Sequence, residues 1–74
     1  MMNIRVVQLG RGLQKHAAAP DATVGDVLEA VGISSKGMEI RVGGRRATQA
    51  DHLKDGDLIT VIPKIKGGSQ SLEA

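Results

Sequence analysis

The sequence predicts an α+β domain in which one short helix packs on one face of a small mixed β-sheet. Several short stretches alternate apolar with polar residues, as half-buried strands do. The clearest helical stretch, residues 23–32, has its apolar residues at helical spacing. The 74 residues suffice for one domain, and without cysteine that domain has no disulfide framework or thiolate metal site.

The first two strands are predicted to form an antiparallel hairpin. Residues 3–9 are rich in β-branched side chains, and residues 13–18 can return beside them. Gly10 and Gly12 lie in the connecting turn, where a positive φ is needed.

The helix carries start and stop signals. Thr23 is a good N-cap, and Asp26 follows three residues later, as in a capping box. Gly32 is expected just past the last turn, with Ile33 making the accompanying apolar contact. The apolar stripe that should face the sheet consists of Val24, Val27, Leu28 and Val31.

The second half of the chain predicts three more strands. Residues 38–42 alternate, with Met38, Ile40 and Val42 expected to point inward. The remaining elements are a turn at 43–44, a brief edge strand at 45–47, a turn at 54–57 and a strand at 58–62. Pro63 cannot donate to a ladder, so strand pairing is expected to end there.

The order strand, strand, helix, strand, weak strand, strand (ββαββ) fits one arrangement best. A single helix covers one face of a sheet, and a crossover through a helix brings a later strand parallel to the first. This is the β-grasp arrangement.

The sequence also resembles the ubiquitin-like β-grasp family, in particular its small sulfur carriers of the ThiS/MoaD type. The likeness rests on the strand order, the Leu53-Lys54-Asp55-Gly56-Asp57 turn, the strand that follows it and the pair Gly67-Gly68. It covers Met2 to Gly68. It implies a β-grasp domain over residues 1–66 and a flexible C-terminal tail over residues 67–74.

The resemblance implies a carrier that is not itself an enzyme. An E1-like adenylating enzyme, using ATP and magnesium, would adenylate the carboxylate of Gly68. That carboxylate would then become a thiocarboxylate or be conjugated, which requires a sulfur acceptor or a conjugation target downstream. The chain would bind no cofactor. Gly67 keeps the tail slim because it has no Cβ, and Lys64, Ile65 and Lys66 lead into it.

The chain departs from the family pattern after Gly68, where residues 69–74 follow. A glycine carboxylate held in a peptide bond cannot be adenylated. Three explanations are open: a precursor trimmed by a JAMM-type peptidase, a cloning remnant, or a protein that is never conjugated.

A second predicted site is the sheet face turned away from the helix. If Ile4 and Val6 point inward, then Val7 and Leu9 point outward, and Ile62 joins them by the same alternation. With Arg5 and Arg41 beside them, these residues predict a mixed apolar and basic surface for a protein partner.

Other functions are less well supported. A non-conjugated interaction subunit, such as an oxygenase effector or an assembly factor, is the main alternative. Arg45, Arg46 and Lys54 form a basic cluster that could bind phosphate or RNA. The chain has no aromatic side chain for stacking bases, which argues against nucleic acid.

The remaining polar residues predict no metal site and no catalytic centre. His16 and His52 are expected to be surface histidines, and the aspartates at 51, 55 and 57 lack calcium-loop spacing. The apolar runs are too short for a membrane span and the N-terminus does not look like a signal peptide, so a cytoplasmic protein is expected.

Overall fold

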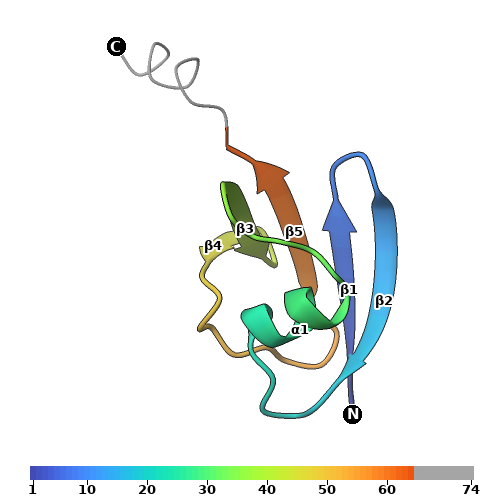
Figure 1. The fold of residues 1–74 in the computed structure, drawn as a ribbon. Coiled ribbons are helices and arrows are strands. Elements are labelled where there is room, and N and C mark those ends of the chain that lie inside the picture. The colour runs from blue at the N-terminus through green and yellow to red at the C-terminus, as the bar shows by residue number, and fades with distance from the viewer. Residues whose placement is uncertain (65–74) are drawn as a thin grey trace.

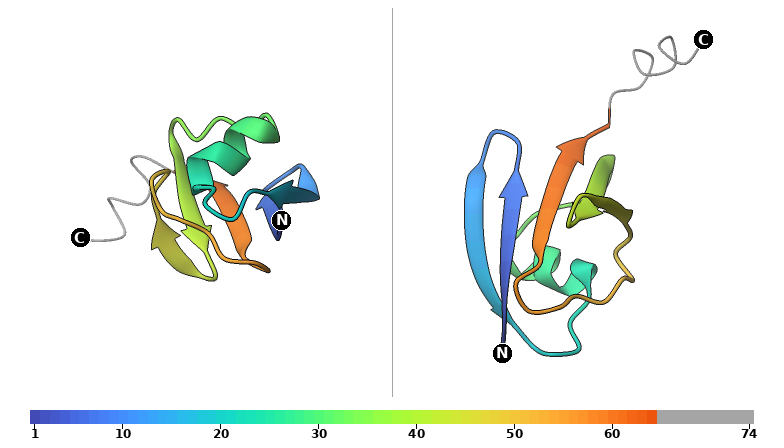
Figure 2. Two further views of the ribbon diagram at one scale, coloured as in Figure 1. Left: turned by 90° about the horizontal axis from the view of Figure 1, so that it is seen from below. Right: turned by 180° about the vertical axis from the view of Figure 1, so that it is seen from behind.

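A five-stranded mixed sheet with one helix on one of its faces makes up the fold (Figures 1 and 2). The computed structural model describes residues 1–64. Its elements are β1 (Met2–Gln8), β2 (Gly12–Ala18), α1 (Val24–Ala30), β3 (Met38–Val42), β4 (Arg45–Ala47) and β5 (Leu58–Pro63). The predicted α+β class and the ββαββ order, with the weak edge strand counted as β4, are confirmed.

The strands lie side by side in the order β2-β1-β5-β3-β4. β1 pairs antiparallel with β2 and parallel with β5, while β3 pairs antiparallel with both β5 and β4. The last strand of the chain is therefore the central strand of the sheet. The left view of Figure 2 shows α1 on one side of this sheet only.

The core lies between α1 and the sheet, and its residues alternate along the strands as predicted. Ile4 and Val6 of β1 and Ile59 and Val61 of β5 are at most 1% exposed. The helix contributes Val24, Val27 and Leu28 to the same core. Partly buried residues at its margin are Val31, Met38, Val42 and Ala47.

Both ends of α1 are closed by local hydrogen bonds. The Thr23 hydroxyl accepts from Asp26 N–H (3.2 Å), and the Asp26 carboxylate accepts from Thr23 N–H (3.0 Å), which confirms the capping box. At the other end Ile33 N–H donates to the Leu28 carbonyl (2.9 Å), which is possible because Gly32 adopts a φ of +79°. These three bonds mark the two ends of a seven-residue helix, which is too short to form alone.

The loop of residues 48–53, between β4 and the Asp-Gly-Asp turn, packs across the start of α1. Val24 N–H donates to the Asp51 carbonyl and Gly25 N–H to the Gln49 carbonyl, both at 2.9 Å. A Cβ at Gly25 would lie 3.2 Å from the Gln49 carbonyl oxygen, so glycine permits this close approach. Donors that most helices leave to water are thus satisfied by a loop distant in sequence.

The Asp-Gly-Asp turn (residues 55–57) fastens the start of β5 to β1. The Asp55 carboxylate accepts from Asn3 N–H at 2.7 Å, and Gly56 N–H donates to the Asn3 carbonyl at 2.9 Å. The Asp57 carbonyl accepts from Arg5 N–H at 3.0 Å. Gly56 has a φ of +89°, which its neighbours could adopt only with strain. The turn therefore holds β1 and β5 in their parallel register.

The prediction that strand pairing ends at Pro63 is confirmed, although β5 includes Pro63 and not only residues 58–62. Pro63 lies opposite Met38 at the end of the ladder, and one further bond joins Lys64 N–H to the Gly37 carbonyl (3.2 Å). In an antiparallel pair only alternate residues exchange hydrogen bonds, and Pro63 occupies a position that needs no donor. Lys64 thus begins beside the sheet and not as a free tail.

We expect Asp55→Ala to lower the free energy of unfolding by about 1–2 kcal/mol, because a charge-assisted hydrogen bond to Asn3 N–H is lost. Urea denaturation followed by circular dichroism measures the change. The matched control is Asp21→Ala, which removes an exposed carboxylate with no hydrogen bond to residues 1–64 and should change stability by less than about 0.5 kcal/mol. Equal effects of the two substitutions would contradict the role of the turn.

We expect Leu28→Ala to cost roughly 2–4 kcal/mol, because it opens a cavity where α1 meets the sheet. Leu28 is 2% exposed. The same measurement on Ala30→Ser, an exposed helical position, should show a change below about 0.5 kcal/mol. An unchanged midpoint for Leu28→Ala would mean that α1 does not pack as described.

Candidate functional site

The sheet face opposite α1, called the outer face below, carries the predicted partner-binding residues. Arg5 and Val7 alternate with buried Ile4 and Val6 along β1, so their side chains point to this face. Ile62 follows buried Val61 on β5, and the Arg41 Cα lies opposite that of Thr60 on the same strand. Leu9 follows β1 in the hairpin loop and is 74% exposed. The right view of Figure 2, taken from behind the view of Figure 1, shows the sheet in front of α1 and so looks onto the outer face.

Several residues of the outer face were not identified from the sequence. Leu13 and Lys15 of β2 lie opposite Val7 and Arg5 of β1, and Leu13 is 56% exposed. Arg46 lies on the same face at the opposite edge of the sheet, where β4 places it opposite Arg41. The positions of Leu13 and Lys15 follow from the register of the hairpin, because the turn at Gly10 and Gly12 fixes which residues of β1 and β2 face each other.

One carboxylate lies among the cations of the outer face. The Nε of Arg41 donates to the Glu39 carboxylate at 2.6 Å, and the two side chains are 44% and 21% exposed. This hydrogen bond is the main cause that lowers the pKa of Glu39 below its ordinary value, and the charges of Arg41, Arg46 and Lys64 lower it further. Glu39 therefore stays ionised and compensates only part of the positive charge around it.

The predicted tail begins at the end of the central strand. Lys64 is exposed and follows the last residue of β5. It lies at the end of the sheet opposite to the N-terminus (Figure 1). Ile65, Lys66, Gly67 and Gly68 lie outside the described residues, so their predicted roles stay predictions.

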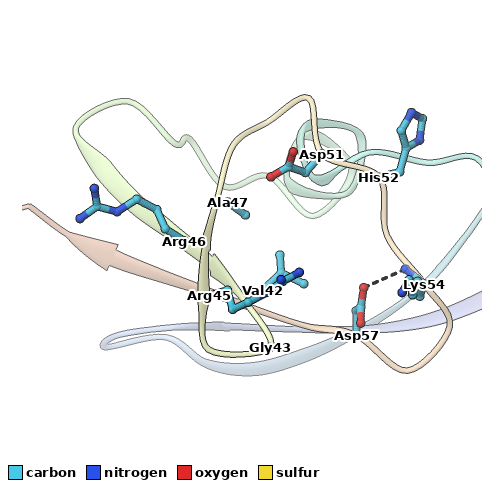
Figure 3. A pocket seen from close by; sticks show the side chains of 9 residues that line it. All are labelled: Val42, Gly43, Arg45, Arg46, Ala47, Asp51, His52, Lys54 and Asp57. Carbon is cyan, nitrogen blue, oxygen red and sulfur yellow. Dashed lines mark hydrogen bonds between the residues drawn. The ribbon is translucent and has the colours of Figure 1, made fainter.

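The structure brings the three residues of the basic cluster predicted at 45, 46 and 54 to one hollow. This hollow of about 380 Å³ lies beside the β3–β4 hairpin and is lined by all three of them together with His52 and others (Figure 3). The Arg46 side chain points away from Lys54 in this view, in agreement with its pairing opposite Arg41. Strand alternation separates the two neighbouring arginines, because consecutive side chains point to opposite faces.

The two aspartates at this hollow are engaged in turns. The Asp57 carboxylate accepts from Lys54 N–H at 2.8 Å, and the Asp51 carboxylate accepts from Thr48 N–H at 2.9 Å. His52 is exposed and pairs through its backbone with Thr23, while His16 is half-buried on the edge strand β2. Among residues 1–64 no group of three or more histidine, aspartate or glutamate side chains could hold a metal ion. Over the same residues, no helix has the length and hydrophobicity of a membrane span.

Three solved structures share this fold. Small archaeal modifier protein 1 from Haloferax volcanii superposes with a TM-score of 0.75 at 18% identity, covering 88% of this chain and 100% of the other. A candidate molybdopterin converting factor, subunit 1, from Pyrococcus furiosus has a TM-score of 0.74 at 20% identity, over 88% and 100% of the two chains. The Caldiarchaeum subterraneum ubiquitin has a TM-score of 0.63 at 24% identity, over 90% and 98%.

These similarities confirm the predicted ubiquitin-like β-grasp fold, which this chain shares with small modifiers and a MoaD-like subunit. The family model described as Mut7-C ubiquitin matches residues 7–68, which is most of the chain. The match includes every element of the fold except the first five residues of β1. The chain therefore belongs to the Mut7-C ubiquitin family of ubiquitin-like domains.

Proposed function

We propose that this protein is a ubiquitin-like carrier whose Gly68 is activated at its carboxylate by an E1-like adenylating enzyme. One observation carries the proposal: the family match ends at residue 68, the second glycine of the diglycine pair. The activated glycine then accepts sulfur as a thiocarboxylate or is joined to another molecule. The carrier contributes no catalytic group of its own, and ATP and magnesium belong to the partner.

The position of the tail supports this role. β5 is paired with β1 up to Val61 and with β3 up to Pro63, so the domain fixes the point from which residues 65–68 continue. A partner can bind the outer face and receive the tail at the same time, because Ile62 on that face lies two residues before Lys64. Residues 69–74 must be removed first, since only a free carboxylate can be adenylated. A JAMM-type peptidase and a cytoplasmic setting are part of the proposal.

We expect adenylation only after trimming. A chain ending at Gly68, mixed with the adenylating enzyme of its host, should support ATP–pyrophosphate exchange, whereas the chain ending at Ala74 should not. Mass spectrometry of protein from the native host should find chains ending at Gly68, some heavier by the difference between sulfur and oxygen. Finding only chains that end at Ala74, in cells that use the pathway, would argue against the carrier role.

We expect Gly67→Ala with Gly68→Ala, in the chain ending at residue 68, to abolish activation, because Cβ groups obstruct a channel shaped for glycine. The matched control is Ala47→Gly, a half-buried position on β4 outside the tail, which should leave pyrophosphate exchange unchanged. Undiminished exchange by the double variant would favour the alternative, an interaction subunit that uses only its sheet.

A further inference from the structure

Two pairs of positively charged side chains lie directly opposite each other on the outer face. Arg5 on β1 faces Lys15 on β2, and Arg41 on β3 faces Arg46 on β4. All four residues are exposed. Like charges at directly opposed positions of antiparallel strands destabilise a sheet. The free protein therefore loses some stability at two places on one surface.

Nearby groups neutralise these two cation pairs only in part. Within residues 1–64 the one ion pair joins Glu39 to Arg41, and the charge of Arg46 also acts on Glu39, so a single carboxylate serves two arginines. Arg5 donates to the carbonyl of Gly56 at 3.3 Å, a neutral acceptor. The carboxylates of the Asp-Gly-Asp turn accept from backbone N–H groups. Each cation pair thus keeps positive charge that a partner could neutralise.

Uncharged side chains separate the two cation pairs. Leu58, Thr60 and Ile62 alternate with the buried residues of β5 and occupy the middle of the outer face. Strands lie ~4.8 Å apart, so β1 and β3 are ~10 Å apart across β5. On β5, Leu58 lies opposite Arg5 and Thr60 lies opposite Arg41. Arg5 and Arg41 are therefore offset by two residues along the strand direction. The Cα atoms of Arg5 and Arg41, the inner members of the two cation pairs, are therefore about 12 Å apart.

We propose that the outer face binds an extended acidic protein segment that crosses the sheet. One carboxylate binds Arg5 of the first cation pair, a second binds Arg41 of the second pair, and an apolar side chain between them contacts β5. Residues four apart in an extended segment point the same way and are ~13 Å apart, which matches the spacing. The motif is Asp-x-Leu-x-Asp. This inference rests on the proposed function, because the acidic segment would belong to the adenylating enzyme that binds the outer face.

The middle of the outer face favours a protein over a nucleic acid. Its side chains are aliphatic or hydroxyl-bearing, and the chain has no phenylalanine, tyrosine or tryptophan on which a base could stack. An aliphatic side chain of a protein segment, in contrast, gains from contact with Leu58, near which the segment crosses β5. Carboxylates complement the two cation pairs and would set the orientation of the segment.

Thermal unfolding of charge-reversal variants tests the destabilising pairs without any partner. Lys15→Glu replaces a like-charge pair with an opposite-charge pair, so it should raise Tm by on the order of 1–6 °C at low salt. Arg46→Glu makes the same exchange opposite Arg41 but loses the attraction to Glu39, so its gain should be smaller. The gain should shrink at high salt because these charges are exposed. Lys36→Glu makes the same change of charge in a loop without a cross-strand cation and should not raise Tm. No rise for either variant would overturn the premise.

Titration of the isotope-labelled full chain with defined peptides, followed by NMR, tests the binding step. A Ser-Asp-Ser-Leu-Ser-Asp-Ser peptide should shift the amide signals at the two cation pairs and along β5, while the peptide with both aspartates changed to asparagine should not. Lys15→Glu combined with Arg46→Glu should weaken binding at least tenfold. Shifts confined to other surfaces, or tighter binding of a single-stranded oligonucleotide at the same residues, would overturn the proposal.

Activation kinetics separate this inference from the carrier role. If the diglycine variant abolishes activation while Lys15→Glu with Arg46→Glu leaves the KM for the carrier unchanged, the carrier role stands and the acidic docking surface is wrong. If the wild-type chain ending at Gly68 is never adenylated but binds the acidic peptide as described, the carrier role is wrong and the acidic-segment site stands.

Discussion

The hydrogen bonds between the Asp-Gly-Asp turn and β1 hold the two central strands in register, and the rest of the structure depends on that register. The side-chain period of a strand is two, so a slip of one residue would turn Ile59 and Val61 out of the core. It would also move Leu58, Thr60 and Ile62 inward. Asn3 and Arg5 therefore determine, through their backbone bonds to the turn, both what is buried and what a partner meets.

The sequence was informative where structure is local. Thr23, Asp26 and Gly32 specify the limits of α1 through bonds that span five residues or fewer, and strand alternation separates the core from the outer face. The packing of residues 48–53 on α1 could not be predicted in the same way. Its bonds to Val24 and Gly25 join segments far apart in the chain, and no local pattern encodes them.

The same distinction holds for the candidate site. Arg5, Val7, Arg41 and Ile62 were placed on the outer face by alternation within single strands, and the structure puts them there. Leu13, Lys15 and Arg46 were missed because their place depends on which residue they face across a ladder. The opposition of like charges is visible only once two strands are aligned, which is why composition and net charge gave no sign of it.

The domain separates stability from recognition by using the two faces of one sheet. The helix, the core and the loop over the helix lie on one side, and the residues proposed to meet a partner lie on the other (Figure 2). Substitutions on the outer face leave the core intact and change stability only through exposed pairs such as Arg5 with Lys15. The tail proposed to carry the chemistry begins next to this face and apart from the core.

The central position of β5 also determines when the newly made protein can fold. During synthesis the hairpin, the helix and the β3–β4 pair leave the ribosome first, yet β1 and β3 have no shared neighbour until residues 58–63 follow. Contacts between β1 and β5 close a long loop and form slowly. A chain that lacks residues 58–63 exposes two unpaired strand edges, so the domain folds only after these residues have been translated.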